Sequence, residues 1–197
     1  MRLVRSDPGR VSLKAHPGED RGARDVGAAG DGGRVDLAPA PRHDLVMGSA
    51  AFVPDGFSPP TSLVGERFVL EPLGPQHNEA DHAAWTSSIE HIRATPGYPD
   101  GGWPPRDGMS LEANLADLRR HAEDFAARKG FTFTVLDPVD DEVLGCVYLY
   151  PPEGVGDVIV QSWVRADRAE LDEPLADAVA AWLHAEWPWK HPDRCGR

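Results

Sequence analysis

The amino-acid sequence predicts an α/β (α+β) domain, a mixed and largely antiparallel sheet flanked by helices, preceded by a disordered N-terminal tail. Three observations predict this class. Residues 66–73 alternate apolar and polar side chains, as a half-buried strand does. Residues 111–125 repeat apolar side chains at helical spacing. Residues 131–165 hold three successive runs rich in β-branched and aromatic residues, which favour strands.

Residues 1–46 are expected to form the tail. They contain no Phe, Trp or Tyr and show neither a helical nor a strand period, so they cannot bury enough apolar surface to fold. Met47 stands where the composition changes, and translation beginning there is one interpretation, whereas a flexible tail is the other. Residues 47–63 are then expected to be a linker, and residues 64–197 the folded domain.

The first predicted strand covers residues 66–73, and Pro72 closes it because proline has no N–H to give to a ladder. A helix over residues 79–93 is expected next, with Asn78, followed by Asp81, as its N-terminal cap. The apolar face of this helix consists of Trp85, Ile89 and Ile92.

Residues 98–108 are rich in proline and glycine and carry Trp103. We expect a loop whose aromatic side chains either pack against the core or await a ligand. Ser110 then caps a second helix over residues 111–125, and Gly130 is expected to stop it.

An antiparallel hairpin is expected from residues 131–137 and 142–150, and residues 157–165 extend it by a third strand. A final helix follows, with Asp172 or Glu173 as its cap. The predicted order is therefore strand, helix, helix, three antiparallel strands and helix.

The formal net charge of −12 argues against nucleic acid or a membrane surface as partner, because both require clustered Lys and Arg. A cationic partner or an amine substrate fits better, although acidic charge also serves solubility alone. The sequence shows no secretory leader and no apolar run of about 18 residues. His77 and His82 stand five apart, so a helix does not bring both onto one metal. We therefore expect a cytoplasmic protein without a metal site.

The predicted order of elements resembles the front half of the GNAT superfamily of acyl-CoA-dependent N-acyltransferases. The segments that carry the resemblance are residues 66–73, 131–135, 143–148 and 161–165, and together it covers roughly residues 64–187. Only ten residues follow Trp187, so the family's fourth helix and last two strands are expected to be missing.

The resemblance implies acetyl-CoA as co-substrate. In the family, the pantetheine arm pairs with exposed backbone groups of the fourth strand, and a glycine-containing loop after that strand wraps the pyrophosphate. Carried onto this sequence, these contacts fall on Trp163, Val164, Arg165 and Arg168. The two arginines equally fit pairing with nearby carboxylates.

This chain departs from the family's loop pattern. Leu171 and Glu173 occupy the positions of the small residues, Asp172 adds a second carboxylate, and Pro174 removes an N–H donor. The sequence thus predicts a loop that caps itself.

The resemblance also implies catalytic roles. It gives the acetyl oxygen a backbone N–H near Trp163 or Val164, Glu90 or His91 as the base, and Tyr148 or Tyr150 as the acid for the thiolate. Glu90 and His91 also fit an ordinary helix surface. The two tyrosines share one strand face, where aromatic packing is the common alternative.

Two functions from different classes follow. One is an enzyme, an N-acyltransferase that transfers an acetyl group from acetyl-CoA to a small-molecule or protein amine. The other is a non-catalytic relative that keeps the fold as a ligand-sensing or partner-binding module with a degenerate CoA site. The sequence leaves the oligomeric state open.

Overall fold

The computed structural model describes residues 51–98, 102–152, 154 and 156–193. The expected tail, residues 1–46, lies outside this part of the chain. The elements are β1 Leu63–Val64, β2 Val69–Pro72, the 3₁₀ helix η1 Pro75–His77, α1 Asn78–Thr86, α2 Ile89–Ala94, α3 Leu111–Ala126, β3 Phe131–Leu136, β4 Val143–Tyr150, β5 Val158–Val164, the 3₁₀ helix η2 Ala166–Leu171, α4 Asp172–Glu186 and β6 Pro192–Asp193.

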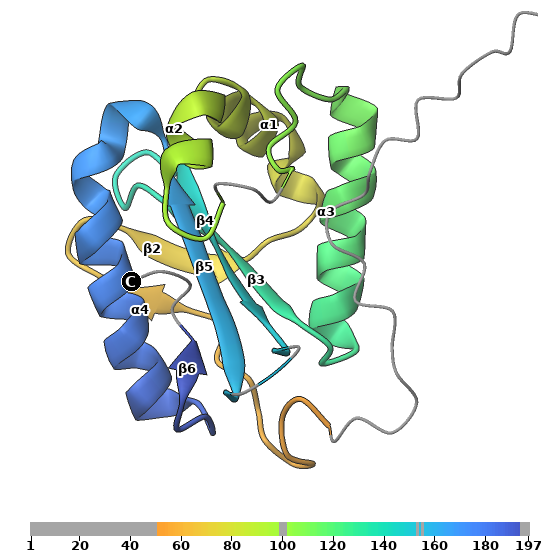
Figure 1. Ribbon diagram of the computed structural model, residues 1–197, viewed down its shortest axis with the longest axis vertical. Helices are drawn as coiled ribbons and strands as arrows, with labels where there is room; N and C mark the ends of the chain where they lie inside the picture. The colour runs from red at the N-terminus through yellow and green to blue at the C-terminus, as the bar shows by residue number, and fades with distance from the viewer. Residues whose placement is uncertain (1–50, 99–101, 153, 155, 194–197) are drawn as a thin grey trace, which may run out of the picture. The chain divides into compact units, whose positions relative to one another are not determined.

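The strands form one sheet in the order β1-β2-β3-β4-β5-β6. Neighbouring strands are antiparallel except for β5 and β6, which are parallel. Figure 1 shows α4 on one side of the sheet and α1, α2 and α3 on the other. The predicted class, a mixed and largely antiparallel sheet flanked by helices, is confirmed.

Successive side chains along each strand point to opposite faces of the sheet, and each face is part of its own hydrophobic core. The first core joins Phe133 and Val147 of the sheet to Trp182 of α4. The second joins Cys146 and Trp163 to the side chains of α1, α2 and α3. Because side chains alternate along a strand, β3, β4 and β5 each contribute to both cores.

The single helix predicted over residues 79–93 is wrong, because it is broken into α1 and α2 between residues 86 and 89. Ser87 Oγ donates to Ala84 O at 2.8 Å, and Ser88 Oγ accepts from the N–H of Ala166 at 3.0 Å. Serine hydroxyls that bond to backbone compete with the helical ladder, which accounts for the break.

Three helix-end predictions are corrected by the structure. His77, at the end of η1, stands at the cap of α1, so Asn78 is not the cap. The cap of α4 is Leu171 at the end of η2, without a side-chain bond, so neither Asp172 nor Glu173 caps it. Helix α3 ends at Ala126, and the left-handed turn that follows is made by Arg128 with φ 59°, not by Gly130.

The cap of α3 is confirmed. Ser110 Oγ accepts from the N–H of Ala113 at 3.1 Å.

The segment expected to be a linker contributes to the first core. Val53 is 2% exposed, and Phe52 stacks on Trp189 with ring centroids 4.8 Å apart. Trp189 Nε1 also donates to Phe52 O at 3.1 Å. The folded part of the chain therefore begins before residue 64.

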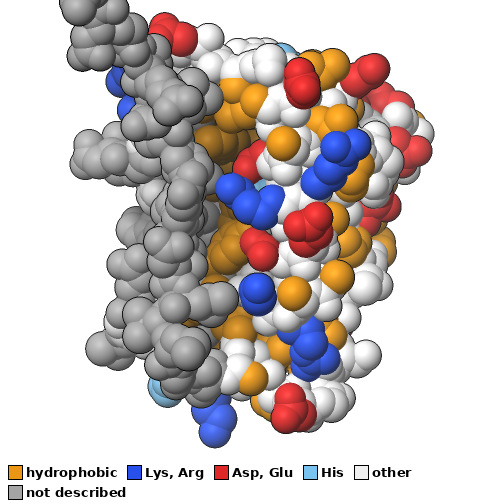
Figure 2. Space-filling model, turned by 90° about the vertical axis from the view of Figure 1, so that its right-hand side faces the viewer, with side chains coloured by type: hydrophobic (Ala, Val, Ile, Leu, Met, Phe, Trp, Pro, Cys, Tyr) orange, Lys and Arg blue, Asp and Glu red, His pale blue; other side chains and the backbone are white. Residues whose placement is uncertain are grey.

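The face on the α3 side carries acidic and basic side chains interspersed with apolar ones (Figure 2). Its described part presents no uniformly basic area of the kind that nucleic acid requires. No helix within the described residues has the length and apolar character needed to span a membrane.

Candidate functional site

The sheet opens at one edge of β5. Strand β6 pairs with β5 only at Val158 and Ile159, opposite Pro192 and Asp193. Beyond Ile159, β5 continues for five more residues with no strand beside it on that side in the part of the chain that the structure describes. We name residues 160–164 the open edge of β5.

The pairing with β4 fixes the direction of the backbone groups on this edge. The N–H of Arg165 donates to Leu144 O at 2.8 Å, so it points toward β4. Backbone groups alternate sides along an antiparallel ladder, so the N–H groups of Ser162 and Val164 point away from β4, to the open side.

Both residues are buried, and their outward N–H groups are unpaired among the described residues. Ser162 is 6% and Val164 0% exposed, and no hydrogen bond to either outward N–H is found among the described residues. Buried backbone groups normally find partners, because an unpaired one costs about as much as a lost hydrogen bond. The open edge therefore suits a ligand that carries amide groups of its own.

Two arginines follow the open edge, and both hold carboxylates. The guanidinium of Arg165 donates to Asp167 through Nε at 2.9 Å and through Nη2 at 2.7 Å, and it also bonds to Glu142. Arg168 Nη2 donates to the other oxygen of Glu142 at 3.3 Å. The bond from Arg165 lowers the pKa of the Asp167 carboxyl. These guanidinium groups are already paired with anions.

The turn after β5 is compact. Residues 166–171 wind into η2, which runs directly into α4, and Leu171 is 3% exposed. A hollow of about 240 Å³ adjoins Arg168, and it is also lined by Arg67 and by the carboxylates of Glu66, Asp137 and Glu170. Where the resemblance predicts a glycine-containing loop, the chain thus has a helical turn beside a hollow lined by both acidic and basic side chains.

Aromatic side chains cover β4 and β5 on the face of the sheet that packs against α1, α2 and α3. Trp163 is fully buried, and its Nε1 donates to Tyr148 Oη at 3.2 Å. The ring of Trp103 lies 5.9 Å from that of Trp163 and 6.2 Å from that of Tyr148. The aromatic loop therefore packs down on the sheet. Burial raises the pKa of Tyr148 well above its usual value, which keeps its phenol protonated.

A buried carboxylate lies beside this aromatic group. Asp81 is 4% exposed and accepts from Asn114 Nδ2 at 3.0 Å and from Cys146 Sγ at 3.5 Å. Burial raises the pKa of Asp81 more than these two bonds lower it. Neither bond comes from a cation, so the ionised carboxylate is poorly compensated.

Tyr150 belongs to a second polar cluster on the same face. Its hydroxyl lies 2.7 Å from His121 Nδ1, and Thr132 Oγ1 lies 3.1 Å from the same nitrogen. His121 is 7% exposed. Sequence reasoning missed this histidine, although Asp117 stands four residues before it on α3, a spacing that places both on one helix face.

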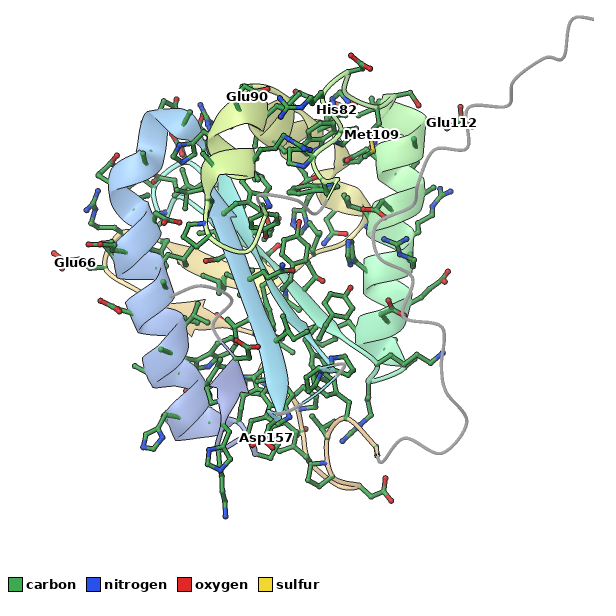
Figure 3. All side chains as sticks on the ribbon, in the orientation of Figure 1. Glu66, His82, Glu90, Met109, Glu112 and Asp157 are labelled. Carbon is green, nitrogen blue, oxygen red and sulfur yellow. The ribbon has the colours of Figure 1, made fainter. Side chains whose placement is uncertain are left out.

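Glu90 and His91 lie apart from these groups, on α2. Glu90 is an exposed side chain that accepts from Arg106 Nη1 at 2.8 Å, and it lies beside α2 at the outer end of the sheet (Figure 3). The buried Nε2 of His91 has no hydrogen-bond partner among the described residues. The figure also shows His82 next to Met109, where its Nε2 lies 2.8 Å from the carbonyl oxygen.

Comparisons with known proteins find solved structures of similar shape but no protein of similar sequence. No protein-family model matches the chain, and no curated protein matches its sequence. The ribosomal-protein-S5-alanine acetyltransferase from Vibrio fischeri is 13% identical with a TM-score of 0.49, over 62% of this chain and 66% of that chain. A probable GNAT-family acetyltransferase from Chromobacterium violaceum is 17% identical with a TM-score of 0.48, over 78% of this chain and 72% of that chain.

A microcin C7 self-immunity acetyltransferase in complex with acetyl-CoA and AMP is 10% identical with a TM-score of 0.48, over 64% of this chain and 66% of that chain. This chain thus spans slightly less than two thirds of the first and third of these structures. At such identities and scores the likeness says nothing about ligand or substrate. The order of the elements and the open edge of β5 agree with the resemblance seen in the sequence.

The fold brings some of the predicted residues together and separates others. Trp163, Val164 and Arg165 follow one another at the open edge, and Arg168 joins them through Glu142. Tyr148 and Tyr150 project from β4 on the opposite side of β5, next to Trp163 and His121. Among the described residues, no hydrogen bond joins the side chain of Glu90 or His91 to either group.

Proposed function

We propose that this chain binds acetyl-CoA along the open edge of β5 and transfers the acetyl group to an amine. The observation that carries the proposal is the pair of outward N–H groups of the buried residues Ser162 and Val164, which have no partner among the described residues. The pantetheine arm of CoA carries amide groups that can pair with a strand edge, as a peptide does when it adds a strand. A ligand of this kind satisfies both N–H groups at once.

The diphosphate would lie beyond Val164, where Arg165 and Arg168 supply forked donors for phosphate oxygens. Binding requires both guanidinium groups to exchange carboxylates for phosphates. Glu142 is partly exposed and stands at the end of a turn, so it can rotate into water. The exchange keeps both arginines paired and therefore costs less than exposing an unpaired charge.

Transfer requires the amine nitrogen to attack the thioester carbonyl while the carbon–sulfur bond breaks. The backbone N–H near Trp163 or Val164 is the proposed donor to the carbonyl oxygen. Tyr148 is the proposed acid for the leaving thiolate, since its phenol stays protonated. Glu90 or His91 keeps the role of base that the family resemblance implies. The acceptor is a small-molecule or protein amine.

The test is calorimetric titration with acetyl-CoA. Ser162→Pro removes the outward N–H while leaving the ladder with β4 intact, because that N–H takes no part in it. We expect Ser162→Pro to lose acetyl-CoA binding and the matched Ser162→Ala to keep it. Circular dichroism checks that both variants fold.

The arginines are tested in the same titration. Arg168→Glu should weaken acetyl-CoA binding at least about tenfold, since a charge-assisted hydrogen bond contributes about 1.5–3 kcal/mol. Arg119→Glu, on the exposed face of α3, makes the same change of charge away from the site and should leave binding unchanged. An equal loss of acetyl-CoA affinity in both variants would show that only the net charge of the protein matters, and not the position of Arg168.

The paired arginines and the compact turn favour the second candidate, a non-catalytic module with a degenerate CoA site. Thermal unfolding separates the two functions. Acetyl-CoA at 100 times its Kd should stabilise the native state by about 2.7 kcal/mol. If millimolar acetyl-CoA does not raise the unfolding temperature, the result rules out the acetyltransferase and supports the non-catalytic module.

A further inference from the structure

A single carboxylate joins the two arginines that follow the open edge of β5. Glu142 accepts from Arg165 Nη1 through Oε1, and from Arg168 Nη2 through Oε2 at 3.3 Å. The side chains of Glu142 and Arg168 are 39% and 37% exposed, whereas that of Arg165 is 18% exposed. One carboxylate therefore bridges two guanidinium groups at a place that solvent reaches.

The turn between β3 and β4 holds the backbone of Glu142 next to these arginines. The carbonyl oxygen of Glu142 accepts from the N–H of Asp137 at 2.9 Å, and its N–H donates to Asp140 Oδ1 at 3.1 Å. The N–H of Val139 donates to Asp137 Oδ1 at 2.9 Å, which tightens the same turn. The turn thus fixes where the Glu142 side chain starts, while its carboxylate can still rotate into water.

Asp167 orients the guanidinium of Arg165 toward Glu142. Its carboxylate accepts from Nε at 2.9 Å and from Nη2 at 2.7 Å, the forked contact that the planar guanidinium favours. Asp167 stands two residues after Arg165, in η2, so this contact is local and does not depend on the turn. The donors that an entering anion can take are therefore the two that Glu142 holds, Arg165 Nη1 and Arg168 Nη2.

Other carboxylates lie near the arginines and stay in place when Glu142 is replaced. The hollow beside Arg168 is lined by three of them, Glu66, Asp137 and Glu170. No hydrogen bond joins any of the three to Arg165 or Arg168 among the described residues. They repel every anion, but only the loss of Glu142 frees both donors.

An entering anion must compete with Glu142 for these two donors. Glu142 belongs to the same chain, so it competes at a high effective concentration and loses little freedom when it binds. A ligand with one phosphate gains contacts similar to those that it displaces. A diphosphate carries one phosphate for each guanidinium and a larger negative charge, so it can hold both arginines after Glu142 has left.

We propose that Glu142 determines the specificity of this anion site: an anion with a single phosphate fails to displace its carboxylate, whereas a diphosphate displaces it. That the diphosphate belongs to CoA rests on the function proposed above, but the competition itself involves only Glu142 and the two arginines. On binding, the Glu142 carboxylate rotates into water, and phosphate oxygens accept from Arg165 Nη1 and Arg168 Nη2 in its place.

Calorimetric titration with inorganic pyrophosphate and with orthophosphate tests the competition without acetyl-CoA. Glu142→Gln keeps the size of the side chain and removes its charge. We expect this variant to bind pyrophosphate about tenfold more tightly than the wild type, because two partly exposed ion pairs no longer have to be broken. Orthophosphate should bind measurably to Glu142→Gln and not to the wild type. Circular dichroism checks that each variant folds.

Asp141→Asn is the matched control. It removes one negative charge from the same turn, and the side chain of Asp141 is exposed and forms no hydrogen bond among the described residues. Asparagine also tolerates the φ of 59° at this position. Its affinity for pyrophosphate should stay within about twofold of the wild type, since an exposed charge without a partner contributes little.

Three results would overturn the competition. They are an equal gain in Asp141→Asn and Glu142→Gln, a loss of pyrophosphate affinity in Glu142→Gln, and no pyrophosphate binding by either protein. The second of these would show that Glu142 holds the arginines in place for the ligand instead of competing with it.

The same titration with acetyl-CoA separates this inference from the proposed function. Tighter pyrophosphate binding by Glu142→Gln, with no acetyl-CoA binding by either protein, overturns the proposed function and leaves the competition. Acetyl-CoA binding of equal strength by the wild type and Glu142→Gln, with equal pyrophosphate binding, overturns the competition and leaves the proposed function.

Discussion

Gly130 gives Tyr150 the room to reach His121, and Gly130→Ala tests this packing. A Cβ built on Gly130 would lie 2.2 Å from Tyr150 Cε1 and 2.6 Å from Cδ1, well inside the closest contacts that real Cβ atoms make. The alanine can be accommodated in two ways. Either the phenol ring swings away from His121, or the backbone between α3 and β3 moves.

Each route has a cost that can be bounded. A ring that swings away loses the bond to His121, about 0.5–1.5 kcal/mol net, and some apolar burial as well. A backbone that moves to relieve overpacking typically loses about 1–3 kcal/mol. The free energy of unfolding should therefore fall by about 1–3 kcal/mol by either route.

Urea unfolding of Gly130→Ala and Gly154→Ala, side by side, measures this loss. A Cβ on Gly154 meets no heavy atom within 4 Å, and the control carries the same gain from a stiffer unfolded chain. The packing argument fails if the two variants differ by less than about 0.5 kcal/mol.

Further predictions concern single contacts. Because burial raises the pKa of Asp81, its favourable contribution is present below the unfolded pKa and is lost as pH rises through the folded one. The difference in free energy of unfolding between Asp81→Asn and the wild type should therefore shift in favour of the variant as the pH rises from about 4 to about 7. Urea unfolding at both pH values measures it, and the same difference at both contradicts the prediction. Ser110→Ala should lower the free energy of unfolding by about 1 kcal/mol in the same assay. An unchanged urea midpoint would show that the cap of α3 does not contribute to stability. Asp157 accepts from the backbone N–H groups of Lys190 and His191, which lowers its pKa, so both amide resonances should titrate below the usual aspartate range. The bonds are present above that pH and are lost as pH falls through the folded pKa; titration in the usual range contradicts the contact.

Local pattern was enough to predict most of the elements. The spacing of Leu111, Leu118 and Phe125 predicted α3, and the β-branched runs predicted β3, β4 and β5. These signals arise from periodic burial on one face, which each segment carries by itself.

The features that were not predicted depend on partners far along the chain. The break between α1 and α2 involves Ser88, which bonds to Ala166, and no local pattern marks that partner. The packing of Phe52 depends on Trp189 near the other end of the chain. Strand β1, with only two residues, is too short to show a period.

The candidate site shows the same division. The resemblance drew attention to Trp163, Tyr148 and Tyr150, which lie together on the sheet, but not to His121. The Asp117 and His121 spacing is visible in the sequence as a pair on one helix face. Only the register of β3 and β4, with the packing of α3 on them, shows that Tyr150 completes it.

Amide hydrogen exchange at the open edge of β5, with and without acetyl-CoA, tests the central claim most directly. Saturating acetyl-CoA should slow exchange at Ser162 and Val164, whose N–H groups gain a partner. Exchange at Trp163 should stay as it is, because the alternation of the ladder already points its N–H toward β4. Unchanged exchange at Ser162 and Val164 under saturating acetyl-CoA would contradict the account.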